Sequence, residues 1–161
     1  MTLKDYNRAV EQYSDNVYRF VLKNCRKEEL AQDIVQDSFE KLWTKLESVD
    51  AQKVKSYLFT TAYHTMLDHL KKENRNTEFE QGNEKEHYHS EQYSDLSEVL
   101  EAALARLPEV QRSVILLRDY EGYSYEEIGE LCSLSESQVK VYIYRGRLQL
   151  KNYLVDMEHL V

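Results

Sequence analysis

The residues whose types and spacing most clearly indicate a binding function lie near the C-terminus, in the run SQVKVYIYRGRLQLKNY (137–153). This run holds four Lys or Arg side chains and no Asp or Glu, although acidic residues outnumber basic ones 29 to 21 in the chain. Val139, Ile143, Gly146 and Leu150 recur at helical spacing and predict the core-facing side of a helix. Basic groups on the other side would neutralise phosphates, and polar groups near the helix start would reach base edges. The candidate nucleic-acid contacts are Ser137, Gln138, Lys140, Val141, Tyr144, Arg145, Arg147 and Lys151.

Two capping boxes mark where helices begin in this region. Ser124 followed by Glu127 predicts a short helix over 125–132, and Ser135 followed by Gln138 predicts a second helix shortly after it. Two capped helices joined by a tight turn are typical of a helix-turn-helix. In that motif the second helix enters the major groove of DNA.

The crossing of these two helices needs small and apolar side chains. Gly129 is the small residue inside the first helix, and Ile128, Cys132 and Val139 supply apolar contacts between the two helices. The alternative interpretation is a basic amphipathic helix on an ordinary three-helix bundle. The spacing of the two caps, with small and apolar residues between them, favours the helix-turn-helix and DNA binding.

A pair of carboxylates lies one helical turn apart in the N-terminal half. Asp33 and Asp37, in the run DIVQDSF, point to one side of a predicted helix. They could form a solvated helix face, an acid/base catalytic pair, or a charged contact for a basic partner. No nucleophile or cofactor motif lies nearby, so we do not expect an enzyme.

His87 and His89, with Glu84, Glu86 and Glu91 close by, have the residue types of a metal site. They lie in an acidic, polar stretch with no rigid scaffold to fix coordination geometry. We therefore favour a solvated acidic tether and expect no metal site.

Composition limits the fold that positions these residues. The 161 residues include four Gly and one Pro, which are too few for a turn-dense all-β fold. The four Gly are also too far apart in the sequence to form a phosphate-binding loop. Cys25 and Cys132 form no CxxC pair and are interpreted as buried small hydrophobes in a reducing compartment. The aliphatic run 114–117 is too short to span a membrane, and the first ten residues lack the apolar core of a signal peptide. We expect an all-α, cytoplasmic protein without a cofactor.

Hydropathy divides the chain into two small helical domains, 1–75 and 96–161, joined by an acidic linker over 76–95. Helical spacing in the first domain falls into three blocks separated by polar breaks at 26–27 and 48–50. Their predicted core-facing stripes include Val17, Phe20, Val21, Leu30, Ile34, Val35, Phe39, Leu42, Trp43, Tyr57, Leu58, Thr61, Ala62, Met66 and Leu70.

The linker and the second domain differ in charge and pattern. Residues 76–95 carry one Lys and six acidic side chains, which is typical of a flexible linker. Helical spacing returns from Leu96, with Pro108 suited to the first turn of a helix that ends before a turn at Glu121 and Gly122. The net charge of −8 is concentrated in 76–136, whereas 137–161 has four basic and two acidic side chains. The acidic total therefore does not exclude a nucleic-acid partner.

Three segments carry a resemblance to a known family. The run ALARLPEVQRSVILLRDYEGYSYEEIGELCSLSESQVKVYIYRGRLQL resembles region 4 of bacterial RNA polymerase sigma factors. ELAQDIVQDSFEKLWTKL resembles region 2.2, and SYLFTTAYHTMLDHLKK resembles regions 2.3–2.4. Two such regions in a short chain, with no further domain between them, are similar to the extracytoplasmic-function (ECF) subfamily. The resemblance covers about residues 10–74 and 96–154.

The resemblance implies roles for residues in the first domain. The DIVQDSF helix matches the family's helix that binds the coiled coil of the polymerase β′ subunit, and the matching positions are Asp33, Gln36, Asp37 and Phe39. The later helix and the loop before it match the element that captures unstacked bases of the promoter −10 element, where aromatic stacking suits single strands. The candidates for bases are Lys53, Lys55, Tyr57, Thr60 and His64, and those for phosphates are Lys71, Lys72 and Arg75.

The match to the family is not complete at every position. Tyr57 stands where the family usually has Trp, and Tyr57 could instead be a core residue; His64 stands where the family usually has Asn. In region 4, the basic helix matches the family's −35-reading helix. Ser133 replaces a common Gly in the turn, and Ser adopts the required geometry at modest cost.

The resemblance implies an ECF sigma factor, which is a monomer in our interpretation. Its expected partners are core RNA polymerase (β′ coiled coil and β subunit), promoter DNA and a cognate anti-sigma factor, often membrane-tethered in this family; no small-molecule substrate is expected. Two alternatives are a sigma mimic that sequesters an anti-sigma factor and a polymerase-independent helix-turn-helix regulator. The acids of the linker could also repel DNA and keep the free chain off promoters.

Overall fold

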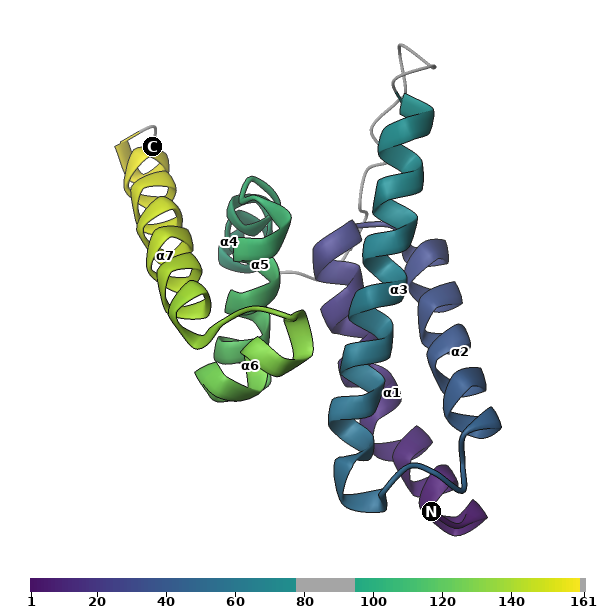
Figure 1. The fold of residues 1–161 in the computed structure, drawn as a ribbon. Helices are drawn as coiled ribbons and strands as arrows, with labels where there is room; N and C mark the ends of the chain where they lie inside the picture. The colour runs from purple at the N-terminus through teal and green to yellow at the C-terminus, as the bar shows by residue number, and fades with distance from the viewer. Residues whose placement is uncertain (78–94, 160–161) are drawn as a thin grey trace. The chain divides into compact units, whose positions relative to one another are not determined.

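The computed structural model describes residues 1–77 and 95–159, with side chains described over 1–74 and 97–156. The chain divides into two compact units, one containing α1 to α3 and the other α4 to α7 (Figure 1). No β-strand occurs within these described ranges. The expected all-α fold with two small helical domains is confirmed. The histidine and glutamate cluster of the predicted linker lies outside the described residues.

The first unit is a bundle of three long helices, α1 (Leu3–Cys25), α2 (Glu28–Thr44) and α3 (Val54–Thr77), with the short η1 (Ala51–Lys53) before α3. Capping interactions and backbone conformation fix the ends of α1. The Thr2 hydroxyl accepts a hydrogen bond from the Asp5 amide at 3.2 Å, and the Asp5 carboxylate accepts one from the Thr2 amide at 2.9 Å. Arg26, with φ of 58°, ends α1 in the left-handed conformation. The hydrogen bonds between Asp5 and Thr2 hold the pKa of the Asp5 carboxyl below its usual value.

The core of this bundle follows most of the predicted stripes. Val17, Ile34, Leu42, Leu58 and Met66 are completely buried. Trp43 was expected in the core, and that prediction is wrong because 53% of its surface is exposed. The Trp43 ring lies at the edge of the bundle against Tyr6, with ring centroids 5.1 Å apart.

The second unit contains α4 (Asp95–Ala105), α5 (Glu109–Ile115), η2 (Leu116–Tyr120), α6 (Tyr125–Cys132) and α7 (Glu136–His159). The buried Arg112 guanidinium donates hydrogen bonds to the Ala105 and Leu107 carbonyls, which closes the corner between α4 and α5. Pro108 is the N-cap of α5, one residue before the predicted first turn. The sequence did not predict η2, a turn of π-helix that extends α5. Gly122, with φ of +75°, makes the predicted turn before α6.

Candidate nucleic-acid interface

The helix-turn-helix of the second unit forms as its two capping boxes predict. The Ser124 hydroxyl accepts from the Glu127 amide at 3.1 Å, and α6 then runs over the predicted residues 125–132. In the second box the Ser135 hydroxyl accepts from the Gln138 amide at 3.1 Å. The Gln138 Oε1 in turn accepts from the Ser135 amide at 2.9 Å. Gln138 therefore uses its carbonyl oxygen in the cap, which leaves its Nε2 group for a base edge.

The turn between α6 and α7 is built around Gly129. The amide of Leu134 donates to the Gly129 carbonyl at 2.8 Å, and Ser133 holds a left-handed conformation with φ of 59°. A Cβ on Gly129 would lie 2.7 Å from the Leu134 carbonyl oxygen, closer than real Cβ contacts. The glycine is therefore required by the close approach of the turn, as the sequence predicted.

The helix α7 packs on the unit with one side and exposes the other. Val139, Ile143 and Gly146 are buried, and a Cβ on Gly146 would overlap the Cδ1 of Ile115. All of the predicted DNA contacts on this helix are exposed: Ser137, Gln138, Lys140, Val141, Tyr144, Arg145, Arg147 and Lys151. Tyr144, at 70%, is the most exposed large hydrophobic residue among those the structure describes. The predicted division of the helix into a core side and a surface side is present in the structure.

Two of these basic groups have acidic partners. The Arg147 Nη2 lies 2.6 Å from the Asp119 Oδ1, and the Lys140 Nζ lies 3.6 Å from the Glu136 Oε1. The hydrogen bond from Arg147 to Asp119 raises the pKa of the arginine above its usual value. Arg147 is thereby fixed against η2, so its guanidinium has a defined position beside the helix.

A cluster of side chains around the Tyr125 ring, beside α7, was not predicted from the sequence. The Arg118 guanidinium carbon lies 4.8 Å from the centre of the Tyr125 ring, and the Lys140 Nζ lies 5.8 Å from it. These distances are those of cation–π contacts. A signal was available, because Arg118 is one of only three basic residues in the acidic stretch 96–136. The cluster extends the basic surface of α7 onto the start of α6.

On the first unit, the candidate polymerase-binding residues of α2 do not all lie on the surface. Asp33 and Gln36 are exposed and Asp37 is half-buried. Phe39 differs, because its ring is only 8% exposed and packs edge-on against Tyr6 at 6.2 Å. The burial of Phe39 agrees with its place in the predicted core-facing stripe, and its contact with polymerase stays a prediction.

A shallow groove of about 390 Å³ between α1 and α2 was not predicted. It lies beside the exposed acidic residues of α2. Its lining is Ser14, Asp15, Tyr18, Gln32, Val35 and Gln36.

The candidate −10 residues of α3 are partly brought together. By helical spacing Tyr57, Thr60, His64 and Lys71 share one face, and each is half-buried or exposed. Lys55 falls on the opposite side, where its ammonium lies 5.8 Å from the centre of the Phe59 ring. The remaining candidates Lys53 and Lys72 are exposed, and the side chain of Arg75 lies outside the described residues.

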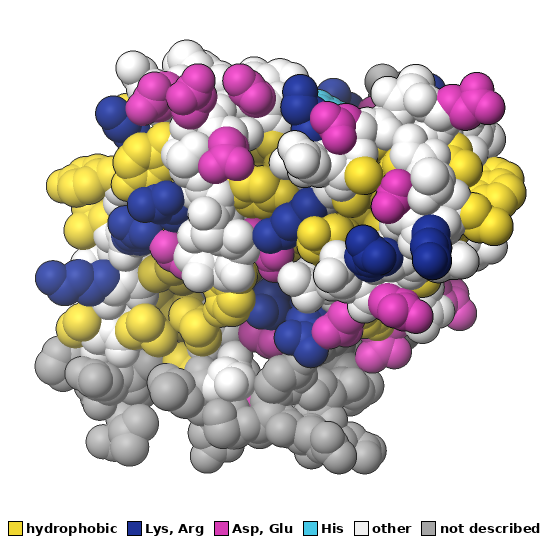
Figure 2. Space-filling view, turned by 90° about the horizontal axis from the view of Figure 1, so that it is seen from below, with side chains coloured by type: hydrophobic (Ala, Val, Ile, Leu, Met, Phe, Trp, Pro, Cys, Tyr) yellow, Lys and Arg dark blue, Asp and Glu magenta, His cyan; other side chains and the backbone are white. Residues whose placement is uncertain are grey.

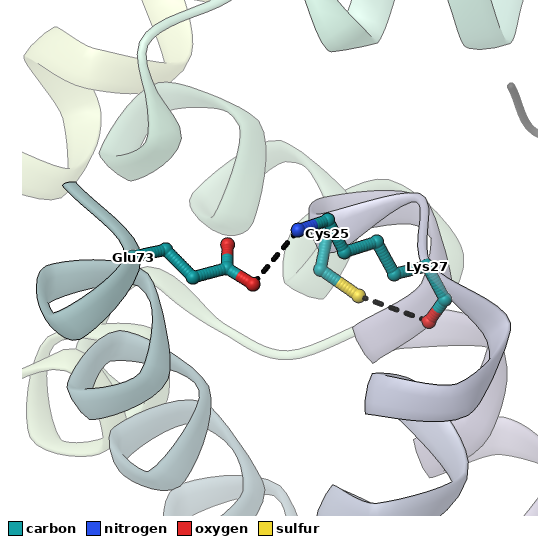
Figure 3. A network of polar contacts seen from close by, with 3 residues as sticks. All are labelled: Cys25, Lys27 and Glu73. Atoms are coloured by element: carbon teal, nitrogen blue, oxygen red, sulfur yellow. Dashed lines mark hydrogen bonds and ion pairs between the residues drawn. The ribbon is translucent and has the colours of Figure 1, made fainter. Parts of the chain in front are cut away.

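The C-terminal part of α3 is tied to the junction of α1 and α2. The Lys27 Nζ lies 2.8 Å from the Glu73 Oε1, and the Cys25 thiol donates to the Lys27 carbonyl at 3.6 Å (Figure 3). Burial raises the pKa of the Cys25 thiol. The ion pair therefore holds the turn of α3 that carries Lys71 and Lys72, while the cysteine is a poor nucleophile.

Three further findings concern the surface charges, metal sites and membrane-spanning helices. Lys and Arg side chains are interspersed with Asp and Glu on the face drawn in Figure 2, with hydrophobic patches between them. Among the described residues, no group of three or more His, Cys, Asp or Glu side chains could hold a metal ion. Over the same residues, no helix has the length and apolar character that a membrane span requires.

Comparison with known protein families matches both units. The model of Sigma-70 region 2 matches residues 9–76, and the model of Sigma-70 region 4 matches residues 97–150. The RNA polymerase sigma factor YlaC of Bacillus subtilis is 30% identical over 87% of this chain and 86% of its own length. The ECF RNA polymerase sigma factor SigE of Mycolicibacterium smegmatis is 28% identical over 94% of this chain, which spans 62% of the length of that relative.

Solved structures agree with these matches. The sigma factor RpoE of Bartonella quintana, solved in complex with the anti-sigma factor NepR, superposes with a TM-score of 0.83 and 27% identity. That similarity covers 94% of this chain and 98% of the other. CnrH, solved in complex with the cytosolic domain of CnrY, shares the fold with a TM-score of 0.67 at 20% identity, over 94% of this chain and 88% of the other.

Proposed function

The chain belongs to the ECF subfamily of RNA polymerase sigma factors, and from that premise we propose which of its surfaces meets each partner. We assign residues 96–161 to the −35 element, residues 1–75 to core polymerase and the −10 element, and 76–95 to a linker. The polymerase would perform the chemistry of transcription, so the chain itself would be no enzyme. It would act in the cytoplasm as a monomer.

The −35 assignment is carried by one observation, the capped α7 with its exposed basic side. The helix begins at Glu136, fixed by the Ser135 cap, and its first turns expose Gln138, Lys140 and Arg145. Residues 137 to 153 include no Asp or Glu, and the acidic groups paired on this surface are Glu136 with Lys140 and Asp119 with Arg147. An N-terminal half with these groups suits the major groove, with Gln138 and Lys140 toward base edges and Arg145 and Lys151 toward the backbone. Arg118 of η2 and Tyr125 at the start of α6 would contact the adjacent DNA backbone.

The assignment of the first unit depends on two faces. The exposed carboxylates of α2 and the adjoining groove toward α1 would meet basic side chains of the β′ coiled coil. The face of α3 that carries Tyr57, Thr60 and His64 would receive unstacked −10 bases. Lys71 and Lys72, on the turn held by the Lys27–Glu73 ion pair, would contact the backbone of the same strand.

The solved structures of related proteins support a regulatory protein partner. RpoE of Bartonella quintana and CnrH were each solved with a partner, named as the anti-sigma factor NepR and the cytosolic domain of CnrY respectively. We propose that a cognate anti-sigma factor binds this chain too and covers surfaces that polymerase or DNA would use.

Binding assays with charge-matched controls test the two interfaces separately. For DNA, Lys140→Ala and Arg145→Ala should each weaken binding to a selected −35 duplex, whereas the exposed Lys4→Ala should not. For core polymerase, Asp33→Lys should weaken binding, whereas the exposed Glu47→Lys should not. Equal effects of variant and control would refute the assignment of that surface.

A further inference from the structure

The ion pair between Arg147 and Asp119 joins two different elements on the basic side of α7. The Arg147 Nη2 lies 2.6 Å from the Asp119 Oδ1, and the two residues are 28 positions apart in the sequence. The pair of Lys140 with Glu136 differs, because its longer distance of 3.6 Å joins residues one turn apart on the same helix. A carboxylate from outside α7 therefore fixes the guanidinium of Arg147.

The turn that presents Asp119 is held by its own contacts. Leu117 is completely buried, and its carbonyl accepts a hydrogen bond from the Tyr123 amide at 3.1 Å. The Arg118 Nη1 donates to the Tyr123 carbonyl at 2.9 Å. Asp119 itself lies in η2, a turn of π-helix, which is a rare conformation that is frequent at functional sites. The backbone that carries Asp119 is thus held independently of Arg147.

Fold stability does not account for this ion pair. The side chains of Arg147 and Asp119 remain 49% and 40% exposed. Ion pairs as open to solvent as this one contribute little to the free energy of unfolding. A carboxylate beside a surface that binds a polyanion also weakens that binding through repulsion. The carboxylate of Asp119 is therefore better explained by a role in DNA binding than by one in stability.

The guanidinium of Arg147 keeps free donors while it is paired. A guanidinium carries five N–H donors in a planar fork, and Asp119 accepts from Nη2. Because half of the side chain is exposed, the remaining donors can reach a DNA phosphate while the contact with Asp119 is kept. The fork is rigid, so a phosphate that binds the paired guanidinium must lie at one place beside η2 and α7.

A single place for the phosphate separates specific from non-specific DNA. When α7 lies on its own site, every phosphate has a fixed position, and Arg147 can bind one of them without leaving Asp119. On other sequences the helix takes many registers, most of which put no phosphate in line with the paired guanidinium. In those registers Asp119 adds repulsion without a compensating contact, and such repulsion disfavours the wrong DNA.

We propose that Asp119 is a specificity-determining residue, which withholds Arg147 from non-specific DNA and holds it for one backbone phosphate of the −35 element. Asp119 acts through Arg147 and is therefore a positioning residue, and this role rests on the proposed function of α7. A purely structural role differs, because loss of Asp119 would then weaken binding to all DNA. A purely repulsive role differs as well, because loss of Asp119 would then strengthen binding to all DNA equally.

Competition binding with the full chain tests the proposal. A −35 duplex selected from a random pool and a scrambled duplex of the same composition give the specific and the non-specific affinity at one salt concentration. We expect Asp119→Ala to bind the scrambled duplex about threefold to tenfold more tightly than wild type. Binding to the selected duplex should change by less than about twofold, so the ratio of the two affinities falls.

Matched variants distinguish the charge of Asp119 from its position. Glu98→Ala removes the charge of an exposed acid on α4, outside the helix-turn-helix, and should change the affinity ratio by less than about twofold. Asp119→Glu restores the carboxylate and should recover most of the ratio. The urea midpoint of Asp119→Ala should stay near that of wild type, because the ion pair is exposed.

A double variant shows whether Asp119 acts through Arg147. In the Arg147→Ala background, Asp119→Ala should change the affinity ratio by less than about twofold. With Arg147 present, Asp119→Ala should raise the salt slope of non-specific binding by about one, since the released guanidinium neutralises a further phosphate. The proposal is overturned by equal changes for both duplexes, by an effect that persists without Arg147, or by an equal effect of Glu98→Ala.

The outcome is separable from that of the −35 assignment. If the wild-type chain prefers the selected duplex and Asp119→Ala leaves that preference unchanged, the role of Asp119 fails and the −35 assignment stands. If the wild-type chain prefers no duplex from the pool over the scrambled one, the −35 assignment fails, and the role of Asp119 fails with it.

Discussion

The close approach at Gly129 gives a quantitative test of how the helix-turn-helix is held. In Gly129→Ala the new Cβ would lie 2.7 Å from the Leu134 carbonyl oxygen, about 0.7 Å inside ordinary contact distance. That oxygen belongs to the backbone of the turn, so relief requires the turn itself to move. Overpacking of this kind costs about 1–3 kcal/mol, and the better helix propensity of Ala offsets about 1 kcal/mol. We expect a net loss of up to about 2 kcal/mol in the free energy of unfolding.

The matched control is Gly146→Ala, at the place where α7 packs against α5. There the new Cβ would meet the Cδ1 of Ile115, the end of a side chain that can change rotamer. We expect a smaller loss of stability and little change in the position of the turn. Urea unfolding followed by circular dichroism gives the free energy of unfolding of each variant. Binding to a −35 duplex reports on the orientation of α7.

The expected result is that Gly129→Ala loses more stability than Gly146→Ala and binds DNA at least about tenfold more weakly than wild type. Wild-type stability and DNA binding in Gly129→Ala would refute the reasoning, because the turn would then tolerate a Cβ. Equal losses of DNA binding in both variants would show that general destabilisation, rather than the turn, is responsible.

Four further outcomes follow from the geometry. Ser133→Gly and Arg26→Gly should each raise the free energy of unfolding by about 0.5–1 kcal/mol, since both residues hold left-handed conformations; lower urea midpoints would contradict this. Cys25 should alkylate more slowly in the folded chain than in urea at pH 8, as mass spectrometry would show, because burial raises its pKa. The capping contribution of Asp5 should be present above its unfolded pKa near 3.8 and be lost as pH falls through its lower folded pKa; Asp5→Asn should remove that part of the pH dependence of unfolding. Arg145→Ala should lower the salt slope of DNA binding by about one, and an unchanged slope would remove Arg145 from the phosphate contacts.

Local sequence signals predicted the part of the site that local chemistry builds. The two capping boxes placed the starts of α6 and α7, because each depends on side chains three residues apart. Gly129 was identified from the same short motif. The exposed set on α7 followed from the helical period, because one side of the helix packs on the unit.

Features that depend on distant parts of the chain were missed. The ion pair of Arg147 with Asp119 joins residues 28 positions apart, and no local pattern indicates it. The apolar period of α2 included both Phe39 and Trp43, but the path of α1 decides which ring is covered. Phe39 lies beneath Tyr6, whereas Trp43 lies at the edge. The groove between α1 and α2 likewise exists only after the helices pack.

The most direct test of the central claim is run-off transcription from a selected promoter pool with the purified chain and bacterial core polymerase. The account predicts specific transcripts that need the chain, and that are lost in Asp33→Lys and weakened in Arg145→Ala. Absence of transcripts together with absence of core binding would contradict it and would favour a sigma mimic that sequesters an anti-sigma factor.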